Sequence, residues 1–248
     1  NSLKLQVSFF KPKILIPFAS FIYFSNQENY YLNDSVNKPS DVVKAFEDSS
    51  TFVKVMKPFE KLDNFDEIDN KDSILFWDKA FKGLAEHKLN LFESVSLIDL
   101  NNSFRAYTER VFKNNSRNLI YLIRIFSPIS SFKPVFIKLN DLNKVIKFDL
   151  FSKTLDLSNK NPDISMSSES FNFILNNTFG FDTLTVNGCF EEESRLGFSR
   201  ATRTLAIENL NNLGISFNIS LIFNIKIIVL FLSRLLRVSK KLSLEVTN

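Results

Sequence analysis

Histidine and cysteine are nearly absent from this chain of 248 residues, which contains one of each. A single cysteine excludes an internal disulfide and any cysteine-rich zinc or iron–sulfur site. A single histidine excludes a binuclear metal hydrolase site built from this chain alone, because such a site needs several imidazoles. A glycine-rich phosphate-binding loop is also excluded, since the five glycines are spread singly along the sequence.

A large excess of one charge is missing as well. The chain has 31 basic and 27 acidic residues, for a net charge of +4. Because the two signs are interspersed, the sequence lacks the concentrated basic surface of a nucleic-acid-binding protein. Hydrophobic residues make up 44% and charged residues 23%, which is typical of a globular protein and excludes disorder over most of the length.

Apolar runs and capping residues predict the elements of the N-terminal part. Residues 12–24 form an apolar run that predicts a strand buried on both faces, which Pro17 ends because it cannot donate to a ladder. Ser40 is positioned to begin a short helix, and residues 48–72 predict a strand followed by an acidic loop. Ser73 is predicted to cap a longer amphipathic helix that contains His87. A lone helical histidine is more often a surface residue than a catalyst.

The pattern changes after a helix predicted at residues 103–115. Short apolar stretches then predict a meander of antiparallel strands at 119–126, 135–139, 145–150 and 154–157. Ser167 and Ser168 begin a predicted helix that runs to Asn176. A short alternating strand is predicted at 182–187 and another amphipathic helix at 199–212. The fold class predicted from these elements is mixed α/β (α+β).

Residues 215–233 form an apolar segment with one charge, Lys226. A central lysine costs about 2.5–3.5 kcal/mol on membrane insertion, and each apolar residue offsets only about 0.3–0.6 kcal/mol. This balance favours a helix that docks on the protein or lies at a membrane surface over one that spans the membrane. We predict that the basic residues after it contact anionic lipid headgroups: Arg234, Arg237, Lys240 and Lys241. The alternative is a core helix with a solvated basic end.

Two segments carry a resemblance to a known family. Residues 12–33 read PKILIPFASFIYFSNQENYYLN, and residues 180–190 read GFDTLTVNGCF. Both resemble the C-terminal portion of a metallo-β-lactamase-fold (MBL-fold) metallo-hydrolase, within the group that includes the CMP-N-acetylneuraminate hydroxylases. The resemblance extends over residues 9–46 and 160–197.

This resemblance implies that residues 1–50 complete an αββα sandwich. The HxHxDH motif that supplies most metal ligands in the family is absent from this sequence, and Ala19 stands near the place of a later histidine ligand. The resemblance therefore places zinc, iron or manganese in a part of the protein upstream of Asn1, and the chain as given is expected to be inactive alone. Because the sequence also opens without methionine, inside what reads as a buried segment, we expect a longer protein.

The resemblance further places the loop at residues 25–37 beside the metal site. Its side chains are expected to bind a sugar- or lipid-linked small-molecule substrate, and the candidates are Glu28, Asn29, Tyr31 and Asn33. The alternative is that Glu28 and Asn33 only shape the loop. No catalytic residue is assigned, because Cys189 needs a base and nothing in the sequence brings His87 near it.

Residues 119–188 resemble a sterol-carrier-like domain, which binds lipids or apolar substrates or dimerises.

The predicted organisation is a sandwich end at 1–50, a connecting strand and helix at 51–100, an accessory α+β region at 101–215 and an apolar-then-basic helix at 216–248. Two other functions stay open: a lipid- or membrane-surface-binding module without catalytic activity, and a remnant without activity. We expect a cytoplasmic location, at the inner face of a membrane, and a homo-oligomer.

Overall fold

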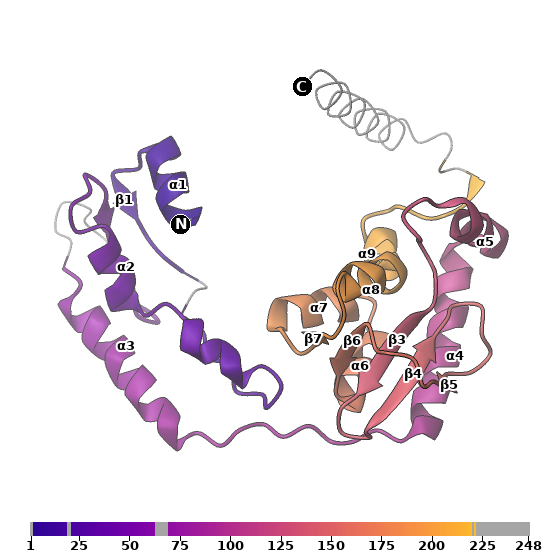
Figure 1. The fold of residues 1–248 in the computed structure, drawn as a ribbon. Coiled ribbons are helices and arrows are strands. Elements are labelled where there is room, and N and C mark those ends of the chain that lie inside the picture. Colours follow the sequence, from indigo (N-terminus) through magenta and orange to yellow (C-terminus); the bar gives the residue numbers. More distant parts are fainter. Residues whose placement is uncertain (1, 19–20, 63–68, 220, 222–248) are drawn as a thin grey trace, which may run out of the picture. The chain divides into compact units, whose positions relative to one another are not determined.

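The structure is a computed structural model that describes residues 2–18, 21–62, 69–219 and 221 (Figure 1). The chain divides into two compact units, unit 1 at Asn1–Leu91 and unit 2 at Phe92–Asn248. Both units combine helices and strands, so the mixed α/β class predicted from the sequence is confirmed at that level.

Unit 1 is built mainly from helices around one short pair of strands. In chain order it contains α1 (Ser2–Phe10), β1 (Ile14–Leu15), the 3-10 helix η1 (Tyr30–Ser35), α2 (Pro39–Ala45), β2 (Phe52–Val53), α3 (Lys71–Gly83) and the 3-10 helix η2 (Leu84–Glu86). β1 and β2 pair in parallel over two residues each. Its core is small, and among the described residues it consists of four buried apolar side chains: Val42, Phe46, Val53 and Val55.

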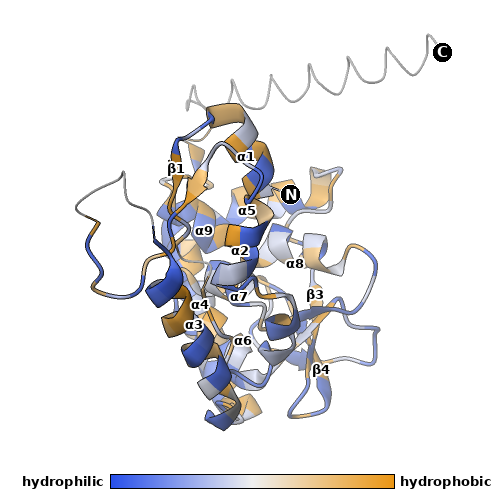
Figure 2. Ribbon diagram, turned by 90° about the vertical axis from the view of Figure 1, so that its left-hand side faces the viewer, coloured by the Kyte–Doolittle hydropathy of each residue, from blue (hydrophilic) through white to orange (hydrophobic). Residues whose placement is uncertain are grey.

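Much of the apolar surface of unit 1 faces outward. α3 carries apolar and polar residues side by side (Figure 2), and its Leu75 and Phe76 are exposed. Outside the helices, Phe18 and Phe59 are also exposed, and Phe59 has a positive φ of 64°. Unit 1 therefore buries few of the aromatic residues in which its sequence is rich.

Three predictions for unit 1 need correction. The strand predicted to end at Pro17 is only Ile14–Leu15, and both of its residues are half-buried, so it is not buried on both faces as predicted. The helix predicted to start at Ser73 begins at Lys71, so Ser73 lies inside it as a buried residue. His87 follows η2 and is exposed, outside the long helix in which it was predicted.

Unit 2 contains a five-stranded mixed sheet in the order β5-β4-β3-β6-β7. Its strands are β3 (Val135–Leu139), β4 (Lys144–Phe148), β5 (Asp156–Leu157), β6 (Ile164–Met166) and β7 (Glu191–Glu192). β6 runs parallel to β3, and the other neighbours are antiparallel. Its helices are α4 (Leu97–Asn114), α5 (Arg117–Phe126), α6 (Ser168–Asn176), α7 (Gly180–Asn187), α8 (Gly197–Leu205) and α9 (Ile207–Asn212).

Aromatic rings join the sheet of unit 2 to its helices. The ring of Phe148 on β4 contacts Phe104 and Tyr107 of α4, with centroids 5.4 and 5.7 Å away. Phe171 of α6 makes a third edge contact with Phe148 at 6.1 Å. All four side chains are fully buried. α4 and α6 therefore cover the face of the sheet that carries its buried side chains, and this face holds the main core.

Some of the elements predicted for unit 2 are confirmed, and others are wrong. The strand at Val135–Leu139 and the helix at Ser168–Asn176 are confirmed, and Ser167 caps that helix by accepting the amide of Ser170. The strand predicted at 119–126 is the helix α5, which begins after the capping serine Ser116. The strand predicted at 182–187 is wrong as well, because these residues are helical.

Residues 182–187 belong to the helix α7, which Gly188 ends in the left-handed conformation at φ 67°. An alternating stretch of six residues is too short to separate a strand from a helix by its periodicity. The helix predicted at 199–212 is two helices, α8 and α9, which are separated at Ala206.

Candidate functional site

The loop at residues 25–37 is held by the side chain of Asn33. Its Oδ1 accepts the amide of Phe24 at 2.9 Å, and its Nδ2 donates to the carbonyls of Phe24 and Tyr30, both at 2.8 Å. Asn26 contributes a further turn contact, since its Oδ1 accepts the amide of Glu28 at 2.9 Å. The loop therefore has a defined shape, and Asn33 is the residue that joins its two ends.

The four predicted substrate-binding residues differ in exposure. Tyr31 is half exposed, Glu28 and Asn33 are partly buried and Asn29 is buried. A hollow of about 600 Å³ lies beside the loop, and Asn33 is among its lining residues whereas the other three are not. Sequence reasoning missed the remaining wall of this hollow, which comes from Tyr23, Tyr30, Val36, Lys38, Ser40, Asp41, Asp78, Phe81, Lys82 and Leu84.

The hollow of unit 1 has a wall of mixed polar and apolar residues that is nearly neutral in charge. Its two lysines are matched by two aspartates, so no excess charge selects a charged ligand. Tyr23 and Tyr30 meet edge to face with centroids 6.0 Å apart. Burial and the hydrogen bond with Tyr30 raise the pKa of Tyr23. Such a wall is suited to hydrogen bonding with a neutral polar molecule.

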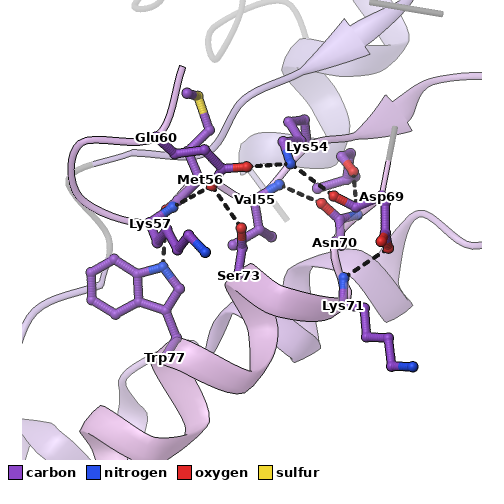
Figure 3. Close-up of polar contacts among 11 residues, drawn as sticks. Lys54, Val55, Met56, Lys57, Glu60, Asp69, Asn70, Lys71, Ser73 and Trp77 are labelled. Carbon is purple, nitrogen blue, oxygen red and sulfur yellow. Dashed lines mark hydrogen bonds and ion pairs between the residues drawn. The ribbon is translucent and has the colours of Figure 1, made fainter. Parts of the chain in front are cut away.

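A buried ion pair between Lys54 and Glu60 joins the residues after β2 to the start of α3 (Figure 3). The ammonium of Lys54 lies 2.7 Å from Glu60 Oε1 and donates to the carbonyl of Asp69 at 2.7 Å. Glu60 Oε2 also accepts from the amide of Lys57 at 2.8 Å and from Ser73 Oγ at 2.7 Å. Burial alone raises the pKa of Glu60, but these bonds outweigh it and lower the pKa to about 2.

The same region is closed by two further side chains, also shown in Figure 3. Asn70 Oδ1 accepts the amide of Val55 at 2.8 Å, and its Nδ2 donates to the carbonyl of Val53 at 2.7 Å. Trp77 Nε1 donates to the carbonyl of Met56 at 2.9 Å. Every donor and acceptor named here is used within unit 1, so we interpret this polar cluster as structural.

A metal site is not formed by the residues that the structure describes. Among them, no group of three or more histidine, cysteine, aspartate or glutamate side chains could hold a metal ion. The described residues therefore do not fit the zinc, iron or manganese that the family resemblance implies, and no chemical step is derived through a metal. Cys189 is buried in the core of unit 2 and His87 is exposed in unit 1.

Unit 2 offers two surface features that the sequence pattern did not reveal. A groove of about 440 Å³, here called the sheet groove, is lined by Ser130, Lys133, Pro134, Phe136, Lys147, Leu157, Ser158, Lys160 and Arg200. The second feature is a row of exposed apolar residues along one side of α5. Only the alternation of the strands could have indicated the groove, because Phe136 and Lys147 face away from the buried positions.

The remaining predicted residues are Arg234, Arg237, Lys240 and Lys241, and they lie outside the described residues, as does most of the segment at 215–233. Within the part of the chain that is described, every helix is too short or too polar to cross a lipid bilayer. The chain matches no family model, no curated protein and no solved structure.

Proposed function

We propose that the chain is the C-terminal part of an MBL-fold, metal-dependent hydrolase or hydroxylase-like protein. In this proposal unit 1 closes the sandwich and the loop at residues 25–37 lines the substrate pocket. The metal ligands come from residues outside this chain, and Asn33 acts as a positioning residue that fixes the shape of the loop. The substrate is a polar small molecule, which suits the nearly neutral wall of the hollow.

The pairing of β1 with β2 carries this proposal. These strands are parallel and two residues long, whereas parallel strands occur almost only in larger sheets that are covered on both faces. An isolated pair of strands is also marginal in water. Together with the small core and the exposed aromatic residues of unit 1, this pairing supports a role at the edge of a larger sheet.

The proposal predicts where metal is retained. We would purify this chain and, in parallel, the chain extended at its N-terminus as its gene encodes, and measure bound zinc, iron and manganese in both. The extended protein is expected to retain about one metal ion or more per molecule, and this chain alone essentially none. An extended protein that binds no metal would contradict the hydrolase proposal.

A second candidate function, binding to a membrane surface, is favoured by α5. Large apolar side chains recur along one side of this helix and the turn after it, at Tyr121, Leu122, Ile125, Phe126 and Ile129. Phe126 is 76% exposed and Ile125 54% exposed. Residues at spacings of four lie on one face of a helix, so these side chains form a stripe. An apolar stripe of this kind can lie in the headgroup region of a bilayer.

Basic residues beside the stripe favour an anionic lipid surface as its occupant. A notch of about 490 Å³ is lined by Tyr121 and Ile125 of the stripe together with Lys133 and with Arg124, whose guanidinium is paired with Asp149 at 2.6 Å. Arg117, at the start of α5, has no carboxylate within ion-pair distance among the described residues. This proposal places the chain in the cytoplasm at the inner face of a membrane, with Arg234, Arg237, Lys240 and Lys241 adding to the attraction.

Removal of the stripe is expected to weaken vesicle binding. In the double variant Ile125→Asn/Phe126→Asn, binding to phosphatidylserine vesicles should fall about 30-fold, because partial burial of these two side chains contributes about 2 kcal/mol. Val186→Asn/Leu213→Asn makes the same change at two exposed sites elsewhere in unit 2 and should bind normally. Cosedimentation with the vesicles measures both.

Equal binding by the two double variants would refute the role of the stripe. Replacing Arg234, Arg237 and Lys241 by glutamine should also lower the affinity and reduce its dependence on salt. Vesicles of phosphatidylcholine alone should bind the unchanged protein more weakly than vesicles that contain phosphatidylserine. If none of these charge-related differences is seen, the stripe on α5 does not bind an anionic lipid surface.

A further inference from the structure

The sheet groove joins an apolar floor to a basic rim. Phe136 and Lys147 are register partners on β3 and β4, on the face of the sheet opposite to the one that α4 and α6 cover. Pro134 and Leu157 extend the apolar floor. At about 440 Å³ the groove lies within the usual size range of small-molecule sites.

One basic residue of the rim, Arg200, is held by hydrogen bonds and an ion pair within unit 2. Arg200 of α8 contacts the carboxylate of Asp163 at 2.6 Å and donates to Ser194 Oγ at 2.6 Å and to the carbonyl of Arg195 at 3.0 Å. Asp163 is buried, and its other oxygen accepts the amide of Phe136 at 2.8 Å. Arg200 is therefore held in place by the residues that come just before β6 and α8.

The other cations of the rim are poorly compensated. Among the described residues, no carboxylate lies within ion-pair distance of Lys133 or Lys160, and Lys147 is 3.8 Å from Asp149. Asp156 stands opposite Lys147 in the β-ladder, but its Oδ1 accepts from Thr154 Oγ1. The ammonium of Lys160 lies 4.9 Å from the centroid of the Phe136 ring, so positive charge is held directly over the apolar floor.

We propose that the sheet groove binds a small organic anion that has a phosphate or carboxylate group on a flat apolar body. The anionic group lies between Lys133 and Lys160, and the apolar body rests on Phe136 in place of the Lys160 ammonium. The hydroxyls of Ser130 and Ser158 are further donors at the rim. This site uses neither unit 1 nor the apolar stripe on α5, although it shares Lys133 and Pro134 with the notch beside that stripe.

The test compares three probes on the full chain: 1-naphthyl phosphate, 1-naphthol and inorganic phosphate. Isothermal titration should show that 1-naphthyl phosphate binds at least tenfold more tightly than either of the others, because only it uses the floor and the rim together. Lys160→Gln should weaken that binding about fivefold or more. Lys153→Gln removes the same charge at an exposed position outside the groove and should leave the binding unchanged.

Phe136→Leu separates the apolar contact from the charge. It should weaken 1-naphthyl phosphate while leaving the weak binding of inorganic phosphate as it was. Equal affinity for 1-naphthol and 1-naphthyl phosphate, equal effects of Lys160→Gln and Lys153→Gln, or no binding of 1-naphthyl phosphate would each overturn the proposal. None of these outcomes changes the metal content or vesicle binding on which the earlier proposals depend.

Discussion

Replacing Gly197 by alanine is expected to lower the free energy of unfolding of unit 2 by about 3 kcal/mol or more. A Cβ atom at this position would lie 2.0 Å from the carbonyl oxygen of Asp163 and 2.8 Å from its carbonyl carbon. Both are backbone atoms, so no side-chain rotation relieves the clash. Overpacking of a well-packed region typically costs about 1–3 kcal/mol, and a clash with fixed backbone lies at the upper end.

The clash would push the start of α8 away from β6, where Asp163 is fixed from three sides. Its amide donates to Phe136, its carbonyl oxygen accepts the amide of Glu193 and its carboxylate contacts Arg200. The sheet groove should therefore lose its affinity for anions together with the loss of stability.

The stability of unit 2 can be followed by the reaction of the single cysteine, Cys189, with a thiol reagent, because this side chain is buried in the native state. Gly83→Ala is the matched control. Nothing lies within 4 Å of a Cβ at Gly83, whose φ is −69°, so alanine there should be neutral or should stabilise α3 by up to about 1 kcal/mol. If Gly197→Ala and Gly83→Ala give equal thiol reactivity in urea, the close approach of α8 to β6 is wrong.

Glu60→Gln is expected to destabilise unit 1 by about 3 kcal/mol. The change leaves the Lys54 ammonium, whose side chain is 6% exposed, without its counter-charge, and breaking a buried ion pair in this way costs about 3–5 kcal/mol. Among its described residues, unit 1 has a core of four buried apolar side chains to offset such a loss. Trp77 is the only tryptophan and lies in unit 1, so its fluorescence during urea unfolding measures this unit alone.

The destabilisation should also depend on pH. Because the pKa of Glu60 is lowered from 4.5 to about 2 in the folded state, its contribution is fully present above pH 4.5. It is lost as the pH falls from 4.5 toward 2, where the carboxylate takes up a proton in the folded protein. The difference between the unchanged protein and Glu60→Gln should therefore shrink over this range.

Glu47→Gln is the control for the charge change, since Glu47 is exposed in the same unit and should alter the free energy of unfolding by less than about 0.5 kcal/mol. A difference between the unchanged protein and Glu60→Gln that stays constant from pH 7 to pH 2 would contradict the role of the ion pair.

Elements were predicted correctly where several features of the sequence, such as periodicity and a capping residue, indicate the same structure. In β3, the buried residues Val135, Ile137 and Leu139 alternate with less buried neighbours, which is the pattern that identified the strand. In α6, the cap at Ser167 and the apolar residues after it both indicate a helix. The family resemblance stays a prediction, because nothing in the comparisons bears on it.

α5 shows why the rest of the fold could not be predicted. Its sequence, RNLIYLIRIF, is dominated by isoleucine and leucine, of which Ile120 and Ile123 pack on unit 2 whereas Leu122 and Ile125 are exposed. An apolar run of this length cannot be distinguished from a buried strand by its periodicity alone. Ser116 was the available signal for a helix, since its side chain accepts the amide of Leu119.

The candidate sites were less predictable than the fold because their walls come from distant parts of the sequence. Asn33 of the loop was identified, but Asp78 and Phe81 reach the same hollow from α3, more than forty residues later. Lys133 and Lys160 meet at the sheet groove only because β6 crosses over to pair with β3. No spacing of residues along the chain encodes such a meeting.

Residues 208–217 contact the end of α4, near the start of unit 2. These contacts set the order in which the unit can form during synthesis. Glu208 pairs with Arg110, Asn211 exchanges hydrogen bonds with Asn115, and the backbone of Phe217 bonds to both Asn115 and Ser116. Nearly one hundred residues must therefore leave the ribosome after α4 before its polar groups find their partners. Contacts so distant in sequence form slowly, and α4 with its apolar face exposed is a ready target for chaperones in the meantime. Unit 1 has no such delay, because every contact described for it lies within the first ninety-one residues.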